Sequence, residues 1–199
     1  MCTTLIVPGL NGSCDAHWQG HWLRERPESR LVDQENWACP VLEDWRDRLE
    51  AALEATDGAY IVAHSLGCIL TASLAGRASA RKVKGALLVA PADLDRVEAL
   101  HPCIVSFGTR PLDPLPFRSI VVGSRNDPYM DVRDLQRHAN AWDSALVDLG
   151  EVGHINVASG FGRWEEGYRI FDRLARQTTG IRKRRSVHVA DSGFGAEAS

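Results

Sequence analysis

The residue that best suggests chemistry is Ser65, which lies between two apolar segments, 60–62 and 68–74. A serine hydroxyl is a weak nucleophile until a neighbouring base accepts its proton. A sharp turn from a strand into a helix exposes Oγ to such a base, and it needs small residues two positions before and two after the serine. Ala63 and Gly67 occupy these positions, with Ala63 standing where Gly is usual. The pattern predicts a nucleophile elbow at Ser65.

A base and an acid follow Ser65 at the ends of two further strand-like segments. The run 119–123 leads into Asp127, and the run 145–149 leads into His154. In an open α/β sheet, functional groups lie just outside the carboxyl ends of the strands, where all three residues are expected. The chain order Ser, Asp, His is that of the α/β-hydrolases. We therefore expect His154 to accept the proton of Ser65, with Asp127 orienting His154.

Two neighbouring residues are rivals for these roles. Asp131 follows Asp127 by four residues, but it falls at the start of a predicted helix, where a carboxylate can instead satisfy free N–H groups. His64 precedes Ser65, and adjacent strand residues point to opposite sides. We expect Asp127 to be the acid, and His64 to orient the elbow or line the site.

Backbone N–H groups are expected to stabilise the oxyanion. The N–H of Leu66 at the start of the elbow helix is one donor. The second donor of this arrangement comes from the loop after an early strand. Here the segment 4–7 runs into a glycine-containing loop, 8–13, so Leu10 or Asn11 is the candidate, with Leu10 preferred.

The remaining site predictions concern the substrate and metals. Trp18, His64 and Phe161 are expected from their positions to line the substrate pocket. His17 and His21 are four apart, as zinc ligands on a helix can be, but Trp18 stands where a metalloprotease has Glu, and no third ligand is evident. We expect no metal and no organic cofactor.

Further motifs resemble one family in particular, the small serine hydrolases related to retinoblastoma-binding protein 9. The matching segments are 7–13, 17–22, 34–45, 64–68, 127–129, 153–156 and 159–164. Together they span about residues 3–178. The resemblance implies a compact α/β-hydrolase fold without a large cap domain, and a triad that maps onto Ser65, Asp127 and His154.

The sequence departs from this family at one point. Some relatives carry a Leu-x-Cys-x-Glu segment that is associated with binding retinoblastoma protein. The segment 66–70 here ends in Leu and belongs to the elbow helix, so that partner is not expected.

Length and composition indicate one domain. The 199 residues suffice for one sizeable core. A net charge of −3 gives no reason to expect nucleic acid as a partner, and no apolar run is long enough to span a membrane. Five cysteines without a C-x-x-C spacing, and an N-terminus without a basic signal region, favour reduced thiols in the cytoplasm. The oligomeric state is left open.

The elements alternate along the chain. Strands are predicted near 3–8, 29–34, 59–64, 83–90, 119–124 and 144–150, and helices near 15–25, 42–56, 66–77, 130–142 and 163–178. This alternation predicts an open, mostly parallel sheet with helices on both faces and no large cap domain, in a single domain over 1–179. The proline-rich segment 91–118 is expected to form a lid or substrate wall, and residues 180–199 a mobile tail.

The sequence thus predicts a serine hydrolase that acts on a small-molecule ester, thioester or amide through an acyl-enzyme. An acyltransferase would use the same residues with another acceptor. A non-catalytic interaction module on the same fold is the alternative from a different class.

Overall fold

The structure is a computed structural model, which describes residues 2–101 and 106–190, with side chains to residue 179. The elements, in chain order, are β1 (Thr4–Val7), α1 (Trp18–Glu25), β2 (Ser29–Leu31), α2 (Leu42–Glu54), β3 (Ala59–His64), α3 (Leu66–Ala72), the 3₁₀ helix η1 (Ala78–Lys82), β4 (Val83–Val89), α4 (Leu94–Leu100), β5 (Ser119–Gly123), α5 (Val132–Ala141), β6 (Ala145–Asp148), the 3₁₀ helix η3 (Val157–Ser159) and α6 (Glu165–Ala190).

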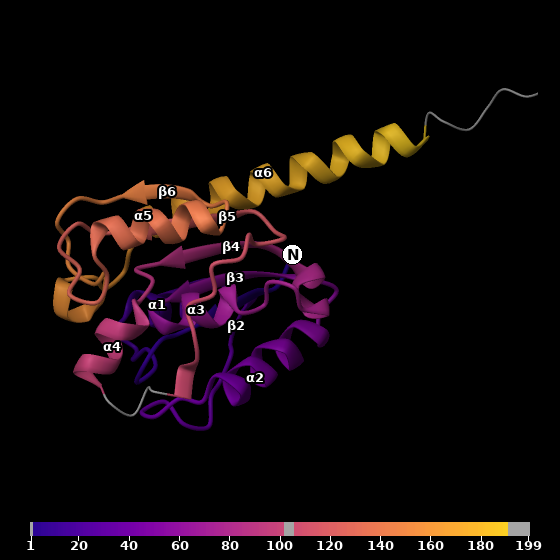
Figure 1. Cartoon of the computed structure of the whole chain (residues 1–199). Helices are drawn as coiled ribbons and strands as arrows, with labels where there is room; N and C mark the ends of the chain where they lie inside the picture. The colour runs from indigo at the N-terminus through magenta and orange to yellow at the C-terminus, as the bar shows by residue number, and fades with distance from the viewer. Residues whose placement is uncertain (1, 102–105, 191–199) are drawn as a thin grey trace, which may run out of the picture.

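The strands form one six-stranded sheet in the order β2-β1-β3-β4-β5-β6 (Figure 1). Each pair of neighbouring strands is parallel. The register places Val7 beside Ala63 and His64 beside Val89, so β1, β3 and β4 end together at one edge. The loops that follow these strands therefore emerge side by side, as the predicted site requires.

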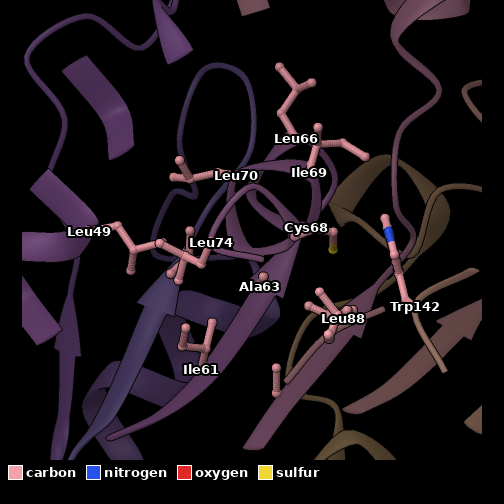
Figure 2. Packing of buried hydrophobic residues seen from close by; sticks show 14 of the residues in the cluster. Leu49, Ile61, Ala63, Leu66, Cys68, Ile69, Leu70, Leu74, Leu88 and Trp142 are labelled. Carbon is pink, nitrogen blue, oxygen red and sulfur yellow. The ribbon is translucent and has the colours of Figure 1, made fainter. Parts of the chain in front are cut away.

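Helices cover both faces of the sheet because its central strands are apolar on both sides. Strand residues such as Ile61 and Ala63 pack with α2, α3 and α5, whereas Tyr60 and Val62 pack with α1 and α6. Figure 2 shows the first of these faces, where α3 lies over β3 and β4. The predicted α/β class and its two-sided sheet are confirmed.

One helix, α4, was not expected. It lies inside the proline-rich segment 91–118, where we predicted no helix. The Asp93 side chain caps it by accepting hydrogen bonds from the N–H groups of Asp95 and Arg96, at 2.9 and 3.3 Å. Leu94 and Val97 then bury one face of the helix. The cap and this three-residue apolar spacing were local signals that the flanking prolines obscured.

The last helix is longer than predicted. We expected a helix near 163–178 followed by a mobile tail, but α6 continues to Ala190, and Figure 1 shows its C-terminal part extending away from the sheet. The rest of the predicted tail, 191–199, lies outside the described residues, as does Cys103, one of the five expected thiols. None of the helices described here combines the length and the apolarity needed to cross a membrane.

Candidate active site

Ser65 occupies the turn between β3 and α3 in a backbone conformation that few residues adopt. Its φ is 55° and its ψ is −122°, outside the regions that L-residues prefer. Such strain persists only where the surrounding structure enforces it, and it is common at functional sites. The turn brings the Ser65 side chain to a pocket, and the residue is 8% exposed.

Close packing explains the small residues around this turn. A Cβ on Gly67 would lie 2.2 Å from the Val7 carbonyl oxygen, so only glycine lets α3 approach β1 so closely. A Cβ on Gly9 would lie 2.7 Å from the Cβ of Ser65. Ala63, in the position where Gly is usual, is fully buried in the sheet, which accommodates its methyl group.

His154 lies between Ser65 and Asp127. Its Nε2 is 3.0 Å from Ser65 Oγ, and its Nδ1 is 2.8 Å from Asp127 Oδ2. A carboxylate only accepts hydrogen bonds, so Nδ1 carries the hydrogen and Nε2 is left to accept from the Ser65 hydroxyl. The three side chains are nearly buried, and the arrangement can transfer a proton from Ser65 to His154.

Asp131, the rival acid, has a different place. It caps α5, where its side chain accepts a hydrogen bond from the Arg133 N–H at 2.9 Å. Asp127 instead accepts a second hydrogen bond, from the Tyr129 N–H at 2.8 Å, which fixes its carboxylate toward His154.

Two N–H groups are available near Ser65 to bind an oxyanion. The Leu66 N–H begins α3 and so has no partner within the helix. The Asn11 N–H donates to the Trp37 carbonyl oxygen at 2.9 Å and is therefore already used. The Leu10 N–H makes no hydrogen bond with the part of the chain described here, and Leu10 lines the pocket. The geometry thus favours Leu10 over Asn11 as the second donor.

The pocket above Ser65 has a volume of about 340 Å³. Its lining residues are Leu10, Asn11, Gly12, Ser13, Cys14, His17, His64, Ser65, Leu66, Val97, His101, Tyr129, His154, Asn156, Val157 and Ala158. Val97 and His101 come from the segment 91–118, which therefore forms part of the wall, as expected.

Two residues expected in the pocket lie elsewhere. Trp18 is 1% exposed and packs between α1 and the sheet, because the apolar face of α1 must be buried there. Phe161 packs edge-on against the Trp164 ring, with the ring centroids 5.7 Å apart, and does not line the pocket. Sequence position alone did not show which face of each element is covered.

Trp18 and His64 instead hold the loop that carries His154. The indole Nε1–H of Trp18 donates to the carbonyl oxygen of Ile155 at 2.9 Å, and His64 Nε2 lies 3.0 Å from the carbonyl oxygen of His154. Because a carbonyl accepts, His64 Nε2 is the donor. Ile155 has a φ of 50°, a strained value for a β-branched residue, so the loop needs such support.

Burial, and not this hydrogen bond, keeps His64 neutral. The His64 ring lies 4.8 Å from the His154 ring, centroid to centroid. Burial, then the neighbouring His154 and His17, hold the pKa of His64 well below its usual value. A neutral His64 can donate from Nε2 to the loop without placing a second positive charge beside His154.

The two histidines considered as metal ligands have separate partners. His17 Nδ1 accepts a hydrogen bond from the Gln19 N–H, and His21 lies 3.9 Å from Glu25. Among the side chains that the structure describes, over residues 2–101 and 106–179, no group of three or more His, Cys, Asp or Glu residues is placed to hold a metal ion.

Comparison with known proteins finds hydrolases among the similar sequences and structures. The chain is 27% identical to YdeN, a Bacillus subtilis (strain 168) protein named as a hydrolase, over 169 residues that cover 78% of this chain and 87% of that protein. A YdeN-like hydrolase from Pectobacterium atrosepticum has a similar structure, with a TM-score of 0.79 and 33% identity over 89% of this chain and 92% of that one. An esterase from Thermogutta terrifontis shares the fold alone, with a TM-score of 0.57 and 16% identity over 94% of this chain and 91% of that one.

The sequence pattern of a protein family described as serine hydrolase matches residues 4–173. This match covers most of the 199 residues and includes the strained Ser65, Asp127 and His154. The chain therefore belongs to the serine hydrolase family.

Proposed function

We propose that this enzyme hydrolyses a small ester, thioester or amide through an acyl-enzyme on Ser65. His154 accepts the Ser65 proton, Ser65 attacks the carbonyl carbon, and His154 then protonates the leaving group. Asp127 holds the Nδ1–H tautomer of His154 and stabilises its charged form. Water, activated by His154, releases the acyl group. The observation that carries the proposal is the continuous hydrogen-bonded line from Asp127 through His154 to the strained Ser65.

The oxyanion is assigned to the N–H groups of Leu66 and Leu10. Both are backbone donors next to Ser65, and neither must reorganise when negative charge develops on the carbonyl oxygen. Leu66 belongs to the elbow, while Leu10 is held by the loop after β1, whose Asn11 N–H is fixed on Trp37.

The pocket supports a small substrate. Its volume of about 340 Å³ lies at the lower end of the range for small-molecule sites. Several of its lining side chains are polar, including Asn11, Ser13, His17 and Asn156. A long acyl chain would need a deep apolar channel to bury its methylene groups.

The finer relationship to the hydrolases related to retinoblastoma-binding protein 9 is part of this proposal. It is supported by the motifs around Gly9, His17, Ser65 and His154. It carries no expectation of binding retinoblastoma protein, because the segment 66–70 is buried in α3 and lacks the acidic residue.

Labelling with a fluorophosphonate probe tests the assignment of Ser65. The wild-type protein should be labelled and should hydrolyse p-nitrophenyl acetate. Ser65→Ala should lose labelling and at least about 10⁴-fold of the activity, because the three residues act as a unit. Ser13→Ala is the matched control, since Ser13 also lines the pocket but its hydroxyl donates to Gln19 at 2.7 Å. Persistent labelling of Ser65→Ala would show that another nucleophile acts.

A further inference from the structure

His17 has a hydrogen-bond donor that nothing in the fold uses. It lines the pocket at the N-terminus of α1 and is 6% exposed. Its Nδ1 accepts the Gln19 N–H at 3.2 Å, capping the helix. A neutral imidazole has one hydrogen, so an accepting Nδ1 places that hydrogen on Nε2. The Nε2 atom is buried and makes no hydrogen bond within the described residues.

An unpaired donor of this kind destabilises the fold and is uncommon in native proteins. His17 is also neutral near pH 7. Burial, followed by the nearby His154, lowers the pKa of His17 to about 4. His17, which lines the pocket, therefore carries a neutral N–H donor.

His17 is one of three adjacent imidazoles. Its ring centroid lies 4.9 Å from that of His64, which in turn lies 4.8 Å from that of His154. His154 is engaged by Asp127 and Ser65, and His64 Nε2 is engaged by the His154 carbonyl oxygen. Of the three, only His17 has an Nε2 without a partner in the described chain.

The chemistry of the pocket limits what this donor can bind. None of the residues that line it in the described chain is Asp, Glu, Lys or Arg. A carboxylate or an ammonium group there would lose its hydration without gaining an opposite charge. A neutral acceptor oxygen needs only the one hydrogen bond that His17 can give.

We propose that the Nε2–H of His17 binds an uncharged oxygen of the substrate, an ether, hydroxyl or carbonyl oxygen other than the scissile carbonyl. This inference rests on the proposed hydrolase function and specifies its substrate class. His17 is thus a specificity-determining residue, which favours oxygen-containing acyl or alcohol groups over hydrocarbon groups of the same shape.

Two substitutions of His17 separate this role from the helix cap. In His17→Asn, the side-chain oxygen can replace Nδ1 as the cap acceptor, and no donor reaches the position of Nε2. In His17→Gln, the longer amide can place an N–H near the Nε2 position, but glutamine is a weaker cap. His21→Asn is the matched control, because His21 lies one turn further along α1 and does not line the pocket.

The assay compares substrates that differ by one CH₂-to-oxygen replacement. Two pairs differ in the acyl group. The first compares p-nitrophenyl butyrate with p-nitrophenyl methoxyacetate, and the second compares p-nitrophenyl valerate with p-nitrophenyl 3-methoxypropionate. The third pair differs in the alcohol group and compares butyl acetate with 2-methoxyethyl acetate. The ratio of kcat/KM within each pair is compared between variant and wild type, so that the intrinsic reactivity of the esters cancels.

In at least one pair, His17→Asn should reduce the preference for the oxygen-containing ester by about three- to tenfold, the effect of losing one neutral hydrogen bond. His17→Gln should restore most of that preference but should have the lower Tm of the two. His21→Asn should leave every ratio unchanged. If His17→Asn changes all three ratios by less than about twofold, the inference is wrong. Fluorophosphonate labelling of the wild type distinguishes this result from failure of the proposed function, because absent labelling would overturn both.

Discussion

Gln19 offers a sharp test of how the loop after β1 is held in place. Its side chain is fully buried. The amide Nε2 donates to the carbonyl oxygens of Val7 and Val62, at 3.3 and 3.1 Å, and Oε1 accepts the Ser13 hydroxyl at 2.7 Å. One side chain therefore ties together β1, β3 and the loop that carries the Leu10 N–H.

Gln19→Met keeps the size of the side chain and removes all three hydrogen bonds. At about 1 kcal/mol for each bond, the free energy of unfolding should fall by about 2–4 kcal/mol. For a domain of this size the Tm should then fall by about 4–16 °C. Because the loop also loosens, kcat/KM for p-nitrophenyl acetate should fall by about tenfold or more.

Two further variants give a graded series, measured by urea unfolding and thermal scans. Ser13→Ala removes only the partly exposed hydrogen bond from Ser13 to Gln19, so it should lower the free energy of unfolding by about 1 kcal/mol or less. Gln19→Glu places a carboxylate oxygen against two carbonyl oxygens, so it should destabilise the protein more than Gln19→Met does. If the Tm of Gln19→Met stays within about 1 °C of the wild type, this buried network does not stabilise the loop and the reasoning is refuted.

Three other predictions follow from the site. Asp127→Asn should lower kcat by about 10³–10⁴-fold, because it favours the wrong tautomer of His154. Asp131→Asn should lower kcat by less than about tenfold. If the two results are reversed, Asp131 is the acid. Urea unfolding should show a loss of stability as the pH falls below about 6.5. The pKa of buried His17 is lowered to about 4, so the unfolded chain binds more protons than the folded protein as the pH falls. His17 alone should therefore lower the free energy of unfolding by about 2 kcal/mol between pH 7.5 and pH 5. His64 acts in the same direction, and a pH-independent stability would contradict both. In a series from p-nitrophenyl acetate to palmitate, short acyl esters should have the higher kcat/KM, and a steady rise with chain length would reveal a deep channel.

The sequence by itself determined the six strands, all the α-helices except α4, and the order in which they follow one another. Apolar runs of strand length alternating with amphipathic helices predict a parallel sheet, because each signal lies within a few neighbouring residues. It also placed Ser65, Asp127 and His154 after three different strands. Parallel strands share one carboxyl edge, so residues that follow them are near one another in any such sheet.

Only the tertiary structure decided which side chains and N–H groups meet. The hydrogen bond from Trp18 to Ile155 joins residues 137 positions apart, and that from His64 to His154 joins residues 90 apart. The same holds for Asn11, whose N–H is occupied by Trp37, and for His17, whose unused donor depends on where α1 packs. Local periodicity predicts which face of a helix is apolar, but it does not specify which residue of a distant loop that face will contact. That choice follows from how the helices and loops pack against the sheet, since packing is set by the whole fold at once.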